Sequence, residues 1–378
     1  MAGILDALVN VVLLLVILVG LVVIHEFGHF VTARLARVRV HEFGIGFPPR
    51  AKIFARDSET IYTLNWLPIG GFVRLEGEEG ESDDPRSFVR QPLRTRLVIL
   101  LAGVTMNFLL AIVIMSLIAG FADPTTSVKV YDVPADDDGT PSPAQVAGIR
   151  GGRQVGVDAT GEPIFDESGD TILAIDGIRF TFLDGPDGPT RYMRENPGKT
   201  VTLTVQNVDG TQRDVQVKLR GHEELHKGAL GIRPRFVPGA YLTRDPVEAT
   251  RVGVRRTVDA CTLILRGLAD LVANLTRPPV AGPIGIAQAV GTVRTEYPPV
   301  FLAYFIAVLS ANLAVVNILP FPPMDGGRIA VSLVQALTGN RVSVALERAV
   351  YLTGFVLLMA LVVWISYFDI QRLATPGT

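Results

Sequence analysis

The sequence predicts a multi-span α-helical membrane protein with about four transmembrane helices and strand-forming segments between them. The 378-residue chain is 48% hydrophobic but only 19% charged, against about 25% charged residues in average soluble domains. Its apolar residues are also concentrated in long runs. The net charge of −2 argues against nucleic acid as a partner, because no basic excess exists to neutralise phosphates. The single cysteine, Cys261, excludes an intrachain disulfide framework and a thiolate zinc cluster.

Residues 7–24 form the first apolar run, with Asn10 as its only polar side chain. A run of this kind is long enough to cross a membrane, because about 20 apolar residues span a bilayer core of about 30 Å. A cleaved signal peptide is the alternative, but the first six residues carry no Lys or Arg. Further apolar runs over 97–121, 300–319 and 350–368 predict three more spans.

The loop charges predict the orientation of these spans. Eleven basic residues lie between the first span and the second, whereas the N-terminal tail before the first span has none. Three more, Arg328, Arg341 and Arg348, lie between the third span and the fourth. Lys and Arg accumulate in cytoplasmic loops. We therefore expect a multi-pass protein of the cell membrane with both termini and the stretch 122–299 outside the cytoplasm.

The cytoplasmic segment 37–96 has the pattern of short strands and turns. EFGIGF and TIYTLNWLPIGGFVRLEGE alternate β-branched and aromatic residues with Gly and Pro. An acidic run over 76–84, EGEEGESDD, follows these strands. We expect this run to be a solvated, mobile loop.

The extracytoplasmic stretch divides into a β-rich part, 122–237, and a helical part, 238–299. Within the first part, two strand patterns flank Asp209-Gly210, which is a strong hairpin signal. Within the second part, residues 246–275 have helical periodicity interrupted by charged side chains. This pattern favours an amphipathic interfacial helix over a fifth span.

The motif H-E-x-x-H lies at the end of the first span, within segment 1–36. His25 and His29 are four positions apart, which on a helix is about 40° around the axis and about 6 Å along it, so both can reach one metal ion. Glu26 can then face a water on that ion. Three ionisable groups beside a membrane helix are costly and mark function. The alternative is a simple interfacial cap, but interfaces usually recruit Lys or Arg instead.

A second copy of the motif runs from His222 to His226. It follows a strand pattern, lies between Gly221 and Gly228, and has no apolar face. Because short isolated helices are marginal, we expect an exposed turn between two strands rather than a metal site.

The third ligand is expected at the cytoplasmic end of the third span, in the segment 317–327, NILPFPPMDGG. A catalytic zinc site usually has three protein ligands and an open position. The prolines force the helix to unwind here, and unwound backbone at membrane depth needs protein or a cavity around it. Asp325 is the candidate ligand. Its alternative role is to cap the helix predicted for GGRIAVSLVQAL, but capping explains neither Asn317 nor the prolines. Two His and one carboxylate suit zinc.

HEFGH at the end of a first span, together with NILPFPPMDGG, resembles the site-2 protease family of intramembrane zinc metalloproteases, and within it the bacterial RseP type. Segment 37–96 resembles the family's membrane-associated β-hairpin region, and segment 122–237 resembles a single PDZ-like domain. Residues 153–168 are an insertion relative to the PDZ pattern. LAGVTMNF resembles the family segment A-G-x-x-x-N, with Val104 where members commonly have Pro.

The resemblance implies that His25, His29 and Asp325 bind Zn²⁺, that Glu26 is the catalytic base, and that Asn317 holds substrate or stabilises the oxyanion. It implies hydrolysis of a peptide bond in or near the transmembrane helix of membrane-protein substrates. Such regulated intramembrane proteolysis could act on an anti-sigma factor or on remnant signal peptides. The expected partners are these substrates and the lipid bilayer. The resemblance also matches Asn107 to an asparagine in the second span of family members, but it implies no role for this residue.

Two other classes of function are alternatives to a protease. The first is a catalytically silent membrane scaffold that presents the PDZ-like domain. The presence of all four candidate site residues argues against it: His25, Glu26, His29 and Asp325. The second is a transporter, because broken helices with buried polar groups also mark ion sites. Four spans without an obvious inverted repeat make a transporter the weaker interpretation.

Overall fold

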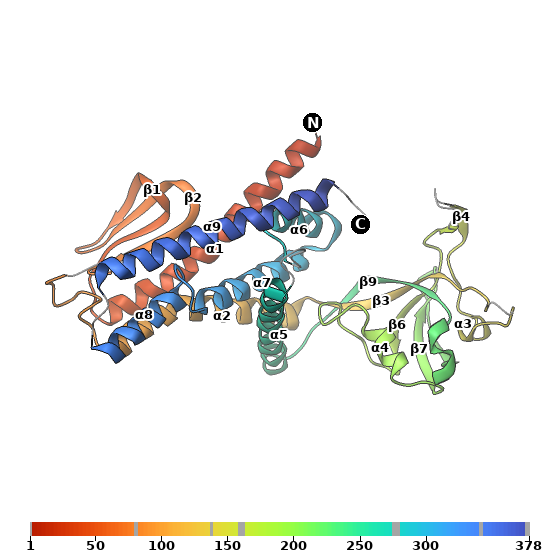
Figure 1. The fold of residues 1–378 in the computed structure, drawn as a ribbon. Helices are drawn as coiled ribbons and strands as arrows, with labels where there is room; N and C mark the ends of the chain where they lie inside the picture. Colours follow the sequence, from red (N-terminus) through yellow and green to blue (C-terminus); the bar gives the residue numbers. More distant parts are fainter. Residues whose placement is uncertain are drawn as a thin grey trace. The chain divides into compact units, whose positions relative to one another are not determined.

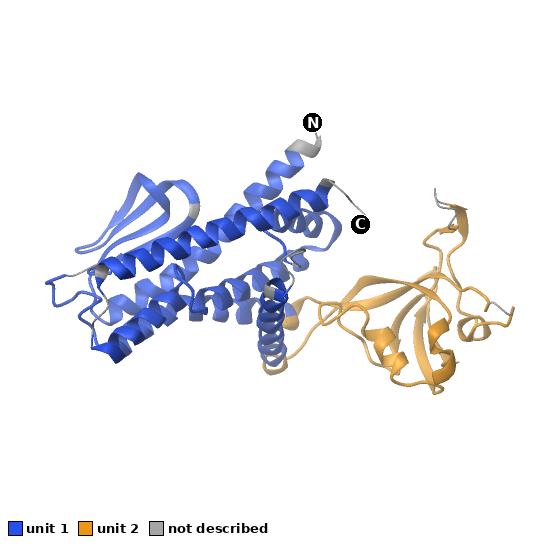
Figure 2. Cartoon of the chain, viewed as in Figure 1, with its two compact units in different colours: residues 1–118, 249–378 blue, residues 119–248 orange. Residues whose placement is uncertain are grey.

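The computed structural model describes residues 2–78, 82–136, 139–157, 163–273, 280–339 and 343–374. It divides the chain into two compact units, 1–118 with 249–378, and 119–248 (Figure 2). The first unit contains most or all of seven helices (Figure 1): α1 (Ala2–Leu35), α2 (Leu93–Phe121), α5 (Pro246–Ala273), α6 (Pro283–Glu296), α7 (Pro299–Ile318), α8 (Asp325–Thr338) and α9 (Val344–Ala374).

Four helices of the described residues are long and apolar enough to cross a membrane, and these candidate spans match the four predicted. They cover Leu5–Leu35, Leu93–Phe121, Pro299–Ile318 and Ala345–Leu373. The first is longer than the apolar run, because no proline interrupts the residues after Ile24 and α1 continues to Leu35. The H-E-x-x-H motif is therefore inside a helix.

Helices α1, α6 and α7 share one apolar core, in which Leu14 and Leu21 of α1 lie with Val290 of α6 and Leu309 of α7. The helix predicted for 246–275 is observed as α5, and it is not among the candidate spans of the described residues. The interfacial position of α5 stays a prediction.

The N-terminus of α6 is held by a side chain of α9. The buried carboxylate of Asp369 accepts hydrogen bonds from the backbone N–H of Gly282, at 3.3 Å, and of Gly285, at 2.9 Å. A negative group at a helix N-terminus satisfies orphan N–H groups and complements the helix dipole. Asp369 thus joins two helices that are far apart in sequence.

The strands predicted in segment 37–96 are confirmed as β1 (Val40–Arg56) and β2 (Ile61–Leu75), which form one sheet. Both strands bend back on themselves, so residues 42–45 have register partners at 61–64 and at 71–74. The sheet packs against α1 and α2 through a buried cluster that includes Val40, Phe43, Val73, Ala33 and Ile99.

The expectation of a solvated loop over 76–84 holds for Asp83, whose side chain is fully exposed, but was wrong for Glu76, Glu78 and Asp84, whose side chains are largely buried in ion pairs. The mobility of this run stays a prediction. Glu76 pairs with His41 at 2.5 Å and accepts a hydrogen bond from Ser82. Glu78 pairs with Arg328 of α8. Opposite charges supplied from other parts of the chain therefore hold this acidic run. Residues 79–81 lie outside the described residues.

The second unit is built on a five-stranded antiparallel sheet in the order β8-β7-β6-β3-β9. A buried apolar cluster, which includes Val130, Ile175, Leu203 and Leu230, forms its core. The strands and short helices are β3 (Asp123–Asp132), α3 (Pro143–Val146), β6 (Thr171–Ile175), α4 (Gly188–Arg194), β7 (Thr200–Gln206), β8 (Gln212–Lys218) and β9 (Arg233–Leu242).

One local prediction for this unit is confirmed. The hairpin at Asp209-Gly210 joins β7 to β8, and Gly210 has the positive φ of +85° that favours glycine. Within segment 153–168, whose status as an insertion stays a prediction, β4 (Gln154–Val157) and β5 (Pro163–Phe165) form a separate two-stranded sheet. Residues 158–162 of the insertion lie outside the described residues.

Candidate metal centre

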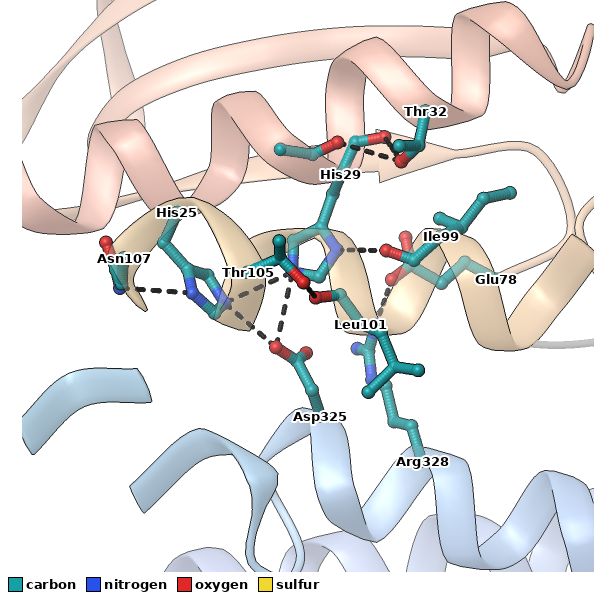
Figure 3. Close-up of polar contacts among 11 residues, drawn as sticks. His25, His29, Thr32, Glu78, Ile99, Leu101, Thr105, Asn107, Asp325 and Arg328 are labelled. Atoms are coloured by element: carbon teal, nitrogen blue, oxygen red, sulfur yellow. Dashed lines mark hydrogen bonds and ion pairs between the residues drawn. The ribbon is translucent and has the colours of Figure 1, made fainter. Parts of the chain in front are cut away.

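His25 and His29 lie on one face of α1 because a spacing of four residues is close to one helical turn. Both are buried, with 5% and 8% of the residue exposed. Their Nε2 atoms lie 3.1 Å apart and point to the same place (Figure 3).

Asp325 reaches this place from a break between two helices. Helix α7 ends at Ile318 and α8 begins at Asp325, with the proline-rich segment between them. Gly326 permits the fold-back, since a Cβ there would lie 2.2 Å from the carbonyl oxygens of Ile318 and Leu319. The Oδ2 atom of Asp325 lies 2.8 Å from Nε2 of His25 and 3.3 Å from that of His29.

The alternative of a helix cap is wrong for Asp325. Met324 occupies the N-cap position of α8, and no side-chain hydrogen bond caps this helix. Asp325 is the first residue of α8, and its carboxylate points to the two histidines (Figure 3).

These three side chains fit a zinc ion. Ligands at about 2.0–2.1 Å around a tetrahedral ion lie roughly 3.3 Å apart, and the separations here are 2.8, 3.1 and 3.3 Å. Although Oδ2 of Asp325 lies close to His25, it is outside hydrogen-bond geometry and buried without a donor among the described residues. A bound cation would satisfy this oxygen and the two nitrogen lone pairs together.

Helix α2 supplies contacts that the sequence did not predict. The Nδ1 atom of His29 donates to the carbonyl oxygen of Ile99 at 2.8 Å, and Nδ1 of His25 lies 3.3 Å from Nδ2 of Asn107. Between them is Gly103, where a Cβ would lie 2.5 Å from Nε2 of His29. A polar residue in an otherwise charge-free span was the signal that could have pointed to this face.

Glu26 lies near the candidate ligands, whereas no described interaction joins Asn317 to them. Glu26 is half-buried on α1, within electrostatic range of His25 and His29, and a Cβ on Gly71 of β2 would lie 3.7 Å from its Cγ. Asn317 is half-buried in the last turn of α7. Within the described part of the chain, no hydrogen bond joins Asn317 to the three candidate ligands, and its predicted role stays a prediction.

One turn after Asp325, Arg328 forms an ion pair with Glu78 (Figure 3). This pair connects α8 to the segment that follows β2. The Glu78 carboxylate raises the pKa of Arg328 above its ordinary value, so the guanidinium stays charged at every physiological pH. The sequence could not reveal this pair because its members are 250 residues apart.

The second H-E-x-x-H motif is a short 3₁₀ helix over His222–Lys227, between β8 and β9, with no buried residue. This agrees with the predicted exposed turn. Among the described residues, the only group of three or more metal-binding side chains that meet is His25, His29 and Asp325.

Known proteins of similar sequence include zinc metalloproteases. A protein of Clostridium acetobutylicum, named as a putative zinc metalloprotease, is 32% identical over 363 residues, covering 96% of this chain and 97% of its own. Zinc metalloprotease RasP of Geobacillus kaustophilus is 26% identical over 461 residues, covering 97% and 99%. The family described as Peptidase family M50 matches residues 13–361. The chain therefore belongs to peptidase family M50, the site-2 protease family, whose members use zinc.

Proposed function

We propose that this chain is an intramembrane endopeptidase that hydrolyses a peptide bond in or near the transmembrane helix of membrane-protein substrates. In this proposal His25, His29 and Asp325 hold Zn²⁺, and Glu26 is the catalytic base. The observation that carries the proposal is that ligand atoms of the three residues, from α1 and α8, lie within 4.8 Å of one another, and that the two histidines are within a candidate span. An anti-sigma factor or a remnant signal peptide would have the form of such a substrate.

The chemistry divides between the ion and the chain. When bound, Zn²⁺ supplies a Lewis acid that polarises the scissile carbonyl and activates water. Glu26 takes the proton of the attacking water and delivers it to the leaving amine. Asn317 donates a hydrogen bond to the developing oxyanion, a role worth about 10² to 10³ in rate in a soluble protease.

A helical substrate must first be unwound, because its carbonyl groups are bonded within the helix. We assign this step to the β1–β2 sheet, which would pair with an extended substrate segment. In support, β1 is exposed from Phe47 to Arg56. Large apolar side chains nearby are also exposed, Trp66 by 71% and Leu67 by 49%, which suits contact with lipid or with an apolar substrate.

The second unit is proposed to be a PDZ-like domain that excludes substrates with large outer domains. Its five-stranded sheet with the short helices α3 and α4 supports this assignment. A hollow of about 620 Å³ lies between α4 and the edge strand β9, lined by residues such as Arg191, Arg194 and Phe236. The β4–β5 insertion forms its own sheet and is not part of this edge.

The proposed orientation places both termini outside the cytoplasm and the metal centre near the cytoplasmic side. Cysteines introduced into segment 76–84, in a chain whose Cys261 is replaced, would resist a membrane-impermeant reagent in intact cells. Labelling of these cysteines from outside would overturn the orientation.

The direct test of the function is cleavage of a single-span substrate in proteoliposomes by wild type and by Glu26→Gln. The variant is expected to keep its zinc but to lose cleavage, and a chelator should abolish cleavage by the wild type. Glu223→Gln is the matched control because Glu223 holds the same place in the exposed second motif. Cleavage that survives Glu26→Gln would exclude the mechanism, and wild-type protein with zinc but without cleavage would favour the scaffold.

A further inference from the structure

Asn107 is a polar residue at a costly position. It lies in the middle of α2, a candidate span, and none of the residue is exposed. Its Oδ1 atom is buried without a hydrogen-bond partner among the described residues. An unpaired buried polar group costs about 1–3 kcal/mol, and polar residues inside a membrane are rarely kept without a use. Among the described residues, the one hydrogen-bond contact of its side chain is with Nδ1 of His25, at 3.3 Å.

The neighbouring histidine shows what a ligand in this centre requires. Nδ1 of His29 faces the carbonyl oxygen of Ile99, which can only accept a hydrogen bond. Nδ1 of His29 therefore carries the proton, and Nε2 of the neutral ring presents its lone pair toward His25 and Asp325. The tautomer of His29 is fixed by α2.

The same requirement decides which end of the Asn107 amide faces His25. If the amide nitrogen donated to Nδ1 of His25, the proton of the neutral ring would be on Nε2, the nitrogen that faces Asp325. Nε2 would then have no lone pair to bind a metal ion. Rotating the amide by 180° occupies nearly the same space. It places Oδ1 where it accepts a hydrogen bond from Nδ1–H, and so gives the orphaned oxygen a donor.

We propose that Asn107 is the positioning residue of His25, whose side-chain oxygen accepts the Nδ1 proton and keeps Nε2 free to bind metal. This inference rests on the ligand set of the proposed function. Helix α2 contributes the groups that face Nδ1 of both histidines, the backbone carbonyl of Ile99 and the side-chain amide of Asn107 (Figure 3). In the proposal, the rotated amide presents its oxygen to His25.

The backbone of Asn107 also makes a contact with α7. The hydroxyl of Ser310 is buried and donates to the backbone oxygen of Asn107 at 2.8 Å. This bond joins α7 to α2 without touching the amide or the histidines. It therefore provides a control in which helix packing is disturbed but the hydrogen bond to His25 is kept.

The test compares the rate at which zinc leaves the full-length protein in detergent for a chromogenic chelator. Replacing a partner of a metal-bound histidine typically costs about 10–100-fold in metal affinity. Asn107→Leu, which has no acceptor, is expected to release zinc about 10–100-fold faster than the wild type. Asn107→Asp keeps an acceptor and Ser310→Ala keeps the amide, so both should remain near the wild-type rate.

A spectroscopic measurement separates the hydrogen bond from packing. The chain has five histidines, so nitrogen-15 labelling of histidine gives few signals. The zinc-loaded wild type should show a protonated Nδ1 on His25 protected from exchange with water, and Asn107→Leu should lose that protection while the signal of His29 is unchanged.

Unchanged zinc release in Asn107→Leu, or release from Asn107→Asp as fast as from Asn107→Leu, would overturn the inference. The failure of the proposed function is a different result. If His25→Ala held zinc as tightly as the wild type, the ligand set would be wrong. If His25→Ala lost zinc while Asn107→Leu kept it, only the role of Asn107 would fail.

Discussion

Replacing Gly103 by alanine is expected to destroy the metal centre without removing any ligand. Gly103 is in α2, and a Cβ there would lie 2.5 Å from Nε2 of His29 and 2.7 Å from Nε2 and Cε1 of His25. These atoms are parts of the rings that the proposed function assigns to zinc. The added methyl group would occupy space directly beside the atoms that bind the ion.

The size of the effect follows from these distances. Non-bonded heavy atoms approach one another to about 3.5–4.0 Å, so both rings or α2 must shift by about 1 Å. Functional sites need their groups within about 0.5 Å of the productive geometry, and a 1 Å displacement can cost about 100-fold in rate. We therefore expect Gly103→Ala to lower cleavage at least about 100-fold and to weaken zinc binding.

The assay is cleavage of a single-span substrate in proteoliposomes, with zinc per chain measured on the same samples. Gly20→Ala is the matched control, because Gly20 is also a glycine of a membrane helix but a Cβ there meets nothing within 4 Å. Gly20→Ala should behave as the wild type. Wild-type cleavage and zinc content in Gly103→Ala would refute the assignment of this space to the metal centre.

Three further predictions concern other parts of the chain. Asp369→Ala leaves two N–H groups of α6 without an acceptor. In a detergent titration it should lower the free energy of unfolding by about 3 kcal/mol, and Asp369→Asn should have a stability between those of the wild type and Asp369→Ala. Replacing both His222 and His226 by alanine should leave zinc content and cleavage unchanged, and equal loss would revive the second motif. Backbone N–H groups in the β1–β2 turn, and then Arg34, hold the pKa of Asp57 at about 2, below the ordinary value of about 3.9. This carboxylate therefore stabilises the turn above about pH 4, and its contribution is lost as the pH falls through about 2. A carbon-13 titration of Asp57 with its midpoint near pH 4 would contradict this prediction.

The parts of the fold that depend on local pattern could be predicted from the sequence. The four spans are visible because a bilayer demands long apolar runs, and the break before Asp325 is visible because prolines cannot continue a helix. The candidate ligands His25 and His29 could be paired because their spacing is set by the geometry of a helix.

The contribution of α2 could not be predicted because it depends on tertiary contacts. Gly20 and Gly103 look alike in sequence, since each is a glycine in an apolar run, but only Gly103 faces the histidines. The carbonyl oxygen of Ile99 has no side-chain signature at all, although it fixes the ring of His29.

Contacts over long sequence separations account for the other differences. The acidic run was expected to be solvated because runs of like charge are usually exposed. Glu78 is instead paired with Arg328, 250 residues away. In the same way, Asp369 caps α6 across more than 80 residues. Net charge and periodicity carry no information about such pairs.

The most direct test of the central claim is X-ray absorption at the zinc edge of the purified, zinc-loaded chain. We predict one zinc per chain with two imidazole nitrogens and a carboxylate oxygen among its ligands. In Asp325→Asn the oxygen contribution should change, and in His29→Ala one imidazole should be lost. A zinc environment that is the same in the wild type and in both variants would show that the ion binds elsewhere, and would contradict the account.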